Sequence, residues 1–253
     1  MDVSLADLAS QLAPVDTAFF FDVDGTLIDI APHPDAVEVP SYLIDDLERL
    51  LAAASGALAL VSGREAANID ALFQPLQLAV SGVHGAQMRL TPRGELIEVS
   101  HPLDGTLRHA LSALASRFDG VLVEDKGASV ALHYRNSPSL APELEAEIAR
   151  IIAVDSRNLT VLPGRMVFEV KRRGHDKGAA VRVFMAEPPF AGRTPVFLGD
   201  DVTDEAGFAA VREMGGIAIS VGRRLPGADF TLSNAQDVRA LIKRLAQFAE
   251  RRD

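Results

Sequence analysis

Two acidic residues, Asp22 and Asp24, directly follow the apolar run "TAFFF" at positions 17–21. An ionised carboxylate is costly to bury without a partner, and a second one nearby adds repulsion. Residues two apart in a strand point to the same side, so we expect both acids to face one cavity. The sequence therefore predicts that a positively charged partner joins them.

A third acidic group, Asp200 with Asp201, follows another apolar run, "VFLG". Three carboxylates at one place repel each other strongly unless a cation binds between them. The chain has no cysteine, and its histidines are dispersed, so a hard ion with oxygen ligands fits best. We therefore expect Mg²⁺ as the cofactor.

Polar residues also follow two further apolar runs, as Ser62-Gly63-Arg64 and as Gly82-Val83-His84-Gly85. Ligands of open α/β sheets bind at the carboxyl ends of the strands, which is where all four groups are expected. Ser62 and nearby backbone N–H groups are donors for anionic oxygens, and Lys177 adds a positive charge. Together with a metal and paired acids, they indicate phosphoryl transfer.

The elements that must position these residues alternate between strand and helix at both ends of the chain. This order predicts an α/β fold with a doubly wound parallel sheet. Between the two ends, alternating apolar and polar residues predict antiparallel hairpins with two helices, an α+β module. We expect a core formed by residues 1–85 and 172–253, with the inserted domain at 86–171.

Within these parts, the predicted core strands are 17–24, 57–63, 78–85, 194–201 and 216–222, and the core helices are 40–55, 64–73, 176–187, 203–214 and 235–250. The predicted module has hairpins at 86–100, 120–135 and 159–174, the last turning at Pro163-Gly164, and helices at 103–118 and 137–152.

Composition limits the classes of function. The 253 residues are 48% hydrophobic and carry a net charge of −10, with basic residues scattered, so no nucleic-acid footprint is present. The absence of cysteine excludes disulfides and thiolate chemistry. Neither a signal peptide nor an apolar stretch of about 20 residues is evident. We expect a cytoplasmic monomer that binds a small molecule and neither nucleic acid nor membrane.

The segments "DVDGT", "SGR", "DKG" and "GDDVTDE" resemble, in order, the four motifs of the haloacid dehalogenase (HAD) superfamily of phosphatases. This resemblance implies that the inserted module is a C2-type cap. It implies Asp22 as the nucleophile, Asp24 as the acid and base, and Ser62 and Lys177 as phosphate ligands. The implied Mg²⁺ ligands are Asp22, the Asp24 backbone carbonyl and Asp200, with Asp201, Asp204, Gly25, Thr26, Gly63 and Arg64 in supporting positions.

Longer segments, "ALVSGRE", "SGVHGAQ", "VEDKGASVALHYR" and "MVFEVKRRGHDKG", resemble the trehalose-6-phosphate phosphatases. This resemblance implies hydrolysis of trehalose 6-phosphate, the final step of trehalose biosynthesis. It implies that Glu124, Lys126 and Glu169 bind the sugar hydroxyls and that His84 and Gly85 contact the substrate. The pattern alone leaves another interpretation open: a surface pair of Glu124 with Lys126, and Glu169 paired with Lys171 or Arg165.

Two alternatives to this function remain at the level of sequence. The same chemistry would serve another sugar phosphate, such as sucrose 6-phosphate or a glycosylglycerate phosphate. The second alternative is a non-catalytic module that is phosphorylated on Asp22, but Asp24 would speed loss of the phosphoryl group from such a module.

Tyr134 shares strand parity with Val130 and Leu132, which predicts that its side chain lies in the core.

Overall fold

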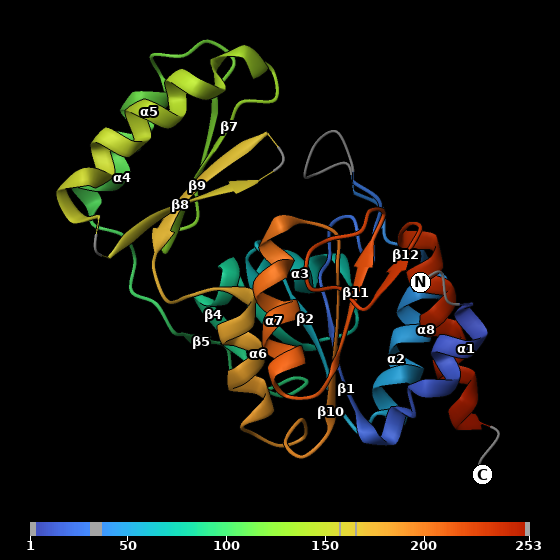
Figure 1. Cartoon of the computed structure of the whole chain (residues 1–253). Coiled ribbons are helices and arrows are strands. Elements are labelled where there is room, and N and C mark those ends of the chain that lie inside the picture. The colour runs from blue at the N-terminus through green and yellow to red at the C-terminus, as the bar shows by residue number, and fades with distance from the viewer. Residues whose placement is uncertain (1–3, 31–36, 157, 165, 251–253) are drawn as a thin grey trace. The chain divides into compact units, whose positions relative to one another are not determined.

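The computed structural model describes residues 4–30, 37–156, 158–164 and 166–250 (Figure 1). The chain forms two compact units. The core unit comprises Met1–Ile97 and Asp176–Asp253, and the inserted unit comprises Glu98–His175. The predicted hairpin at 86–100 contributes to the core sheet, because its first strand pairs with a core strand. The unit boundaries therefore lie at 97/98 and 175/176 rather than at 85/86 and 171/172.

The core unit is built on an eight-stranded sheet in the order β12-β11-β10-β1-β2-β3-β4-β5. All neighbours from β12 to β3 are parallel, and β4 is antiparallel to β3. This mostly parallel sheet confirms the predicted fold class. The strands are β1 (Thr17–Phe21), β2 (Leu58–Val61), β3 (Ala79–Gly82), β4 (Gln87–Arg89), β5 (Ile97–Glu98), β10 (Thr194–Gly199), β11 (Ile217–Val221) and β12 (Phe230–Leu232).

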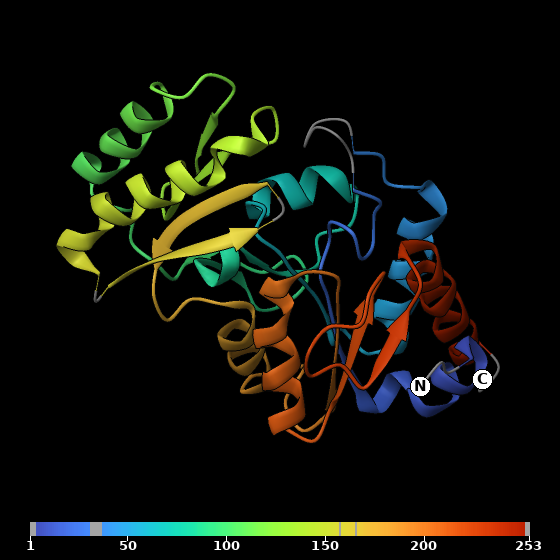
Figure 2. The same ribbon diagram turned by 45° about the horizontal axis from the view of Figure 1, so that its top comes forward.

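Helices cover both faces of this sheet, which explains why its central strands are apolar throughout. Helices α1, α2 and α8 pack together on one side, and α6 and α7 pack together on the other (Figures 1 and 2). The core helices are α1 (Leu5–Gln11), α2 (Ser41–Ala53), α3 (Ala66–Leu72), α6 (Lys177–Met185), α7 (Glu205–Glu213) and α8 (Ala235–Glu250). None of the described helices has the length and apolarity needed to span a lipid bilayer.

The strand order reverses at β1, and open α/β sheets usually bind ligands at such a reversal. From β1 the chain continues to β2 and β3 on one side, whereas β10, β11 and β12 lie on the other. The loops that follow β1 and β10 therefore diverge at the carboxyl ends of adjacent strands, the usual ligand site of an open α/β sheet. The register Phe21↔Leu198 brings the ends of these two strands level.

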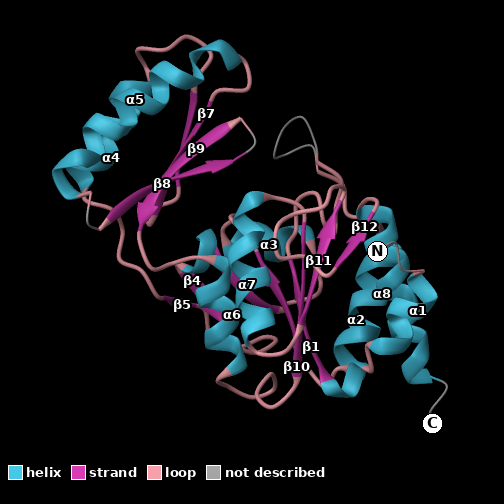
Figure 3. Cartoon of the chain, in the orientation of Figure 1, coloured by secondary structure: helices cyan, strands magenta, loops and turns pink. Residues whose placement is uncertain are grey.

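The inserted unit is a four-stranded antiparallel sheet, in the order β6-β7-β9-β8, with two helices (Figure 3). Alternate residues such as Val130, Leu132 and Val170 are buried with helix residues in a second hydrophobic core. Tyr134 joins this core by stacking on Phe168, with ring centroids 4.9 Å apart, as predicted. The elements are β6 (Leu122–Asp125), β7 (Ser129–His133), β8 (Leu159–Gly164), β9 (Val167–Arg172), α4 (Gly105–Ala115) and α5 (Ala141–Ile152).

Two details differ from the predicted elements. Strand β1 ends at Phe21, so Asp22 and Asp24 lie in the turn after the strand, and strand alternation does not orient them. Strand β8 continues through Pro163 and Gly164, where a turn was predicted. The pairs Pro163↔Phe168 and Gly164↔Val167 keep both residues in the ladder, so the hairpin reverses after them.

Candidate active site

A buried ion cluster lies where β1 and β10 end. The ammonium of Lys177, the first residue of α6, lies 2.6 Å from Oδ1 of Asp22 and 2.5 Å from Oδ1 of Asp204. All three side chains are at most 7% exposed. Charge-assisted hydrogen bonds of this kind are the strong ones in a protein interior. The sequence placed Asp204 only in a supporting position, and the structure places it at the centre of the cluster.

Asp204 organises the loop after β10. Its second oxygen, Oδ2, accepts hydrogen bonds from the backbone N–H groups of Asp200 and Asp201, at 3.0 and 2.9 Å. Asp201 is the N-cap of the short helix Val202–Asp204, and its carboxylate lies 3.6 Å from the guanidinium of Arg223. Asp201 therefore holds the loop, while Asp200 is left beside Asp22 and Asp204.

The cluster carries more negative charge than Lys177 neutralises. Burial, reinforced by Asp204 and Asp200 and opposed by Lys177, raises the pKa of Asp22 well above its ordinary value. Burial, followed by repulsion from Asp204, raises the pKa of Asp200 to about 7. Burial alone would lower the pKa of Lys177, but Asp204 and Asp22 together outweigh it and raise that pKa, so Lys177 keeps its charge. The raised pKa values of Asp22 and Asp200 mark a site where an added cation would be stabilised.

The donor set fits a divalent cation with oxygen ligands. One carboxylate oxygen each from Asp22, Asp200 and Asp204 lies within 4.8 Å of the others. Both oxygens of Asp204 already accept hydrogen bonds, which leaves Asp22 and Asp200 as the side chains able to bind a metal directly. Carboxylate oxygens match the ligand preference of Mg²⁺.

Gly25 permits this close approach. A Cβ atom at Gly25 would lie 2.2 Å from Oδ2 of Asp200, and its φ of +87° lies in the left-handed region. Only glycine satisfies both constraints. Thr26 follows it with a buried hydroxyl that has no hydrogen-bond partner among the described residues. The glycine of "DVDGT" is therefore required by its contact with Asp200, which lies in the loop after β10, far away in sequence.

The carboxylate of Asp24 is held by Arg64. This carboxylate accepts two hydrogen bonds from the guanidinium of Arg64, at 2.6 and 2.7 Å. The structure thus places Asp22 and Asp200 together, as predicted, and holds the Asp24 side chain on Arg64. This pairing gives Arg64 of "SGR" a specific contact that the motif alone did not indicate.

Backbone hydrogen bonds link the loop after β2 to the loop after β3. The carbonyl oxygen of Ser62 accepts from the N–H of His84 at 3.0 Å, and that of Arg64 accepts from the N–H of Val83 at 2.9 Å. His84 packs against Gly63, where a Cβ would lie 2.5 Å from its Nε2. Val83, His84 and Gly85 all have positive φ, an uncommon conformation for the first two. Residues held in such a conformation carry local strain, and strain of this kind clusters at functional sites.

A polar cluster occupies the inserted unit. The ammonium of Lys126 lies 3.8 Å from Glu124 and 3.6 Å from Glu169. Lys126 therefore lies between the two acids. The ammonium of Lys171, one alternative partner of Glu169, donates to the carbonyl of His175. The other alternative partner, Arg165, lies outside the described residues. Ser129 and His133 also contact the acids, and sequence reasoning did not assign them.

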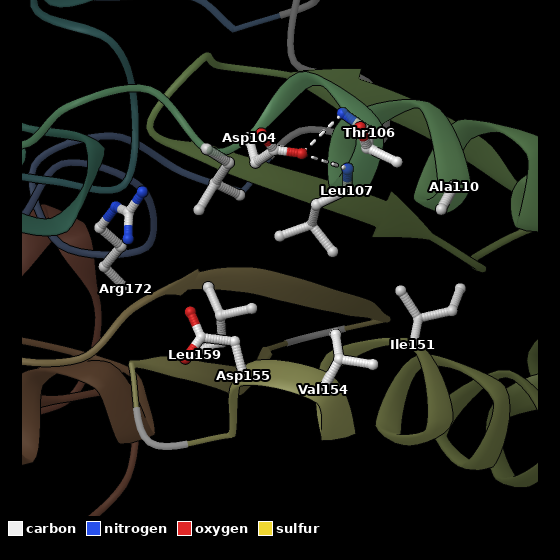
Figure 4. A pocket seen from close by; sticks show the side chains of 10 residues that line it. Asp104, Thr106, Leu107, Ala110, Ile151, Val154, Asp155, Leu159 and Arg172 are labelled. Carbon is white, nitrogen blue, oxygen red and sulfur yellow. Dashed lines mark hydrogen bonds between the residues drawn. The ribbon is translucent and has the colours of Figure 1, made fainter.

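A separate pocket of about 270 Å³ lies in the inserted unit between the start of α4 and the end of α5 (Figure 4). Apolar side chains, among them Leu107 and Ile151, form most of its lining. Asp104 lies at its edge and caps α4 by accepting from the N–H groups of Thr106 and Leu107. The pocket contains none of the predicted site residues.

Comparisons with known proteins show the family of the chain. Residues 20–229 match the family model described as trehalose-phosphatase. The chain is 40% identical to the trehalose-6-phosphate phosphatase of Escherichia coli (strain K12) over 222 residues, covering 87% of this chain and 83% of that protein.

Solved structures show the same fold. The C-terminal domain of Candida albicans trehalose-6-phosphate phosphatase is similar with a TM-score of 0.85 at 20% identity, covering 98% of each chain. A phosphatase of the HAD superfamily from Bacteroides thetaiotaomicron is similar with a TM-score of 0.56 at 16% identity, covering 89% of this chain and 92% of that one. Since the family model spans both units and most of their length, the chain belongs to the trehalose-phosphatase family, within the HAD-superfamily fold.

Proposed function

We propose that the protein is a Mg²⁺-dependent phosphatase that hydrolyses trehalose 6-phosphate to trehalose and phosphate, the final step of trehalose biosynthesis. The observation that carries this proposal is the buried Asp22–Lys177–Asp204 cluster with Asp200 beside it. Membership of the trehalose-phosphatase family supports the substrate. Magnesium is the ion that phosphatases of this superfamily generally use, and the acidic cluster suits it.

In the first step, an Asp22 oxygen attacks phosphorus, and the bond from phosphorus to the sugar oxygen breaks. Asp24 donates a proton to that oxygen as trehalose leaves, and a phospho-aspartate remains on Asp22. In the second step, Asp24 takes a proton from water, which attacks phosphorus and releases phosphate. Lys177 orients Asp22, and Ser62 with nearby N–H groups binds the phosphoryl oxygens. Bound Mg²⁺ would neutralise charge on the phosphoryl group.

The inserted unit is proposed to act as a C2-type cap that recognises the sugar. Glu124, Lys126 and Glu169 form a connected set of acceptors and donors, which is the chemistry that binds sugar hydroxyls in pairs. His84 and Gly85, on the loop after β3, are proposed to contact the substrate from the core unit. Sugar binding by the cap would select the leaving group, while the core unit acts on the phosphate.

Phosphate release with Mg²⁺ from trehalose 6-phosphate, glucose 6-phosphate, sucrose 6-phosphate and p-nitrophenyl phosphate tests this proposal. We expect a strong preference for trehalose 6-phosphate and loss of all activity in EDTA. A preference for another sugar ester would retain the phosphatase and reject the substrate. No activity on any ester, with or without EDTA, would favour the non-catalytic alternative.

The variant Glu169→Ala tests the role of the cap. We expect it to reduce hydrolysis of trehalose 6-phosphate far more than hydrolysis of p-nitrophenyl phosphate, because the aryl ester has no sugar hydroxyls to bind. Equal losses on the two substrates would mean that Glu169 has a structural role.

A further inference from the structure

The register of the inserted sheet places two acids on either side of one small residue. Ala131 of β7 pairs with Glu124 of β6 on one side and with Glu169 of β9 on the other. Directly paired residues project on the same face of a sheet, so both acids lie on the face opposite to Val130 and Leu132. On β7 itself, the residues two positions before and after Ala131 also lie on this face; they are Ser129 and His133.

Each of these two β7 residues contacts a different acid. The hydroxyl of Ser129 donates to Oε1 of Glu169 at 2.5 Å. The Nε2 atom of His133 lies 3.0 Å from Oε2 of Glu124. Strand β7 therefore provides one hydrogen-bonding partner for Glu169 and one for Glu124, on opposite sides of Ala131.

The ionisation of Glu124 decides which atom donates the hydrogen bond between His133 and Glu124. The hydrogen bond from His133 is the largest factor that lowers the pKa of Glu124, so Glu124 is a carboxylate and Nε2 carries the hydrogen. The Oε1 atom of Glu124 accepts no hydrogen bond from the described part of the chain. The side chains of Glu124 and His133 are 41% and 34% exposed, so a ligand hydroxyl is able to reach them.

We propose that Ser129 and His133 are positioning residues for sugar recognition, with Ser129 orienting Glu169 and His133 orienting Glu124. This inference rests on the proposed function of the two acids. A free glutamate loses side-chain entropy when a ligand orders it, whereas a glutamate that a neighbour already holds loses less. Two acids held on either side of Ala131 present acceptors at a fixed spacing, which favours a ligand with hydroxyl groups at a matching spacing.

Variants of these residues test the inference when kcat and KM are measured on trehalose 6-phosphate and on p-nitrophenyl phosphate. We expect His133→Ala to raise KM for trehalose 6-phosphate about tenfold or more, the usual effect of losing a hydrogen bond to a charged group. Ser129→Ala should act in the same direction. On p-nitrophenyl phosphate, both variants should stay within about twofold of the original protein, because this ester does not engage the acids.

Two further variants separate positioning from structure. His133→Gln retains an N–H donor at a similar reach, so it should restore most of the affinity that His133→Ala loses. The matched control is His109→Ala, an exposed histidine of α4, which should leave both substrates unaffected. Unchanged KM for trehalose 6-phosphate in both alanine variants, or equal losses on the two substrates, would overturn the inference.

The substrate preference of the unsubstituted protein separates a failure of this inference from a failure of the proposed function. If that protein prefers a different sugar phosphate, the proposed substrate is wrong, and the same variants are compared on the preferred ester. A selective loss there supports the β7 residues as positioning residues, and no selective loss overturns them. If no sugar phosphate is preferred over the aryl ester, the sugar-binding role of the inserted unit and of β7 is overturned together.

Discussion

Arg64 donates two hydrogen bonds to Asp24, from Nε to Oδ2 at 2.6 Å and from Nη2 to Oδ1 at 2.7 Å. The guanidinium occupies both oxygens of the residue proposed to transfer protons to and from the sugar oxygen and water. Asp24 must therefore turn from Arg64 to act, and Arg64 fixes the position from which it turns.

The variant Arg64→Lys retains the charge but lacks the planar fork, so it should hold Asp24 less firmly. We expect a decrease in kcat of about tenfold for trehalose 6-phosphate, which requires a proton on its leaving alcohol. The decrease should be smaller for p-nitrophenyl phosphate, whose leaving group needs no proton. Steady-state kinetics on both esters measure this difference. Arg223→Lys is the control, because it makes the same substitution at an arginine that pairs with Asp201, at 3.6 Å, and not with Asp24.

The two acids of "DVDGT" should fail in different ways when each becomes an amide. Asp22→Asn removes the nucleophile, so we expect no turnover and no rapid first release of p-nitrophenol. Asp24→Asn retains the nucleophile and loses the base for the second step, so a burst of about one product per enzyme should precede slow turnover. Rapid-mixing absorbance measures both. Substantial activity in folded Asp22→Asn, checked by circular dichroism, would contradict the nucleophile assignment.

Gly25→Ala should damage the active site more than the fold. Its Cβ would lie 2.2 Å from Asp200 Oδ2, and a displacement of about 1 Å in an active site costs up to about 100-fold in rate. Gly222→Ala is a matched control, because its φ of +76° imposes a similar backbone cost with nothing within 4 Å of the new atom. We expect similar thermal stability for the two variants and a large loss of kcat only in Gly25→Ala. Equal rates would mean that Asp200 adjusts freely.

Stability should depend on pH and Mg²⁺ together. The folded pKa of Asp200, about 7, exceeds its ordinary value of 3.8, so the metal-free fold binds this proton more tightly than the unfolded chain does. Metal-free stability should therefore decrease as pH rises from about 4 to about 7, the range between the two pKa values. Above pH 7 the ionised Asp200 is available to bind Mg²⁺, whereas at lower pH protons compete.

We expect Mg²⁺ to raise Tm more at pH 8 than at pH 5.5, which thermal unfolding with and without the ion measures. At a concentration about 100 times Kd, the free energy of unfolding should increase by about 2.7 kcal/mol. In Asp200→Asn the increase should be smaller at both pH values. An equal rise in Tm at pH 5.5 and pH 8 in the unsubstituted protein would argue against Asp200 as a ligand.

The sequence was informative where local chemistry decides the outcome. Apolar runs followed by polar turns located the central strands, and "DVDGT" with "GDDVTDE" located the acids that meet at β1 and β10. It was less informative where pairing between distant segments decides. The place of Ser129 beside Glu169 depends on the register of β7 and β9, and the Asp24–Arg64 pair joins two separate loops. Short runs such as β12, with three residues, carry too weak a pattern to predict.

The position of β1 between β2 and β10 also has a consequence for how the protein is made. A growing chain contains Asp22 from the start, yet Lys177 and Asp204 follow only after the whole inserted unit has been synthesised. Closing so long a loop costs entropy, and a segment that folds on its way out leaves less freedom to lose. Catalytic competence therefore arises late in synthesis, after α6 has supplied Lys177 to Asp22 and β10 has paired with β1.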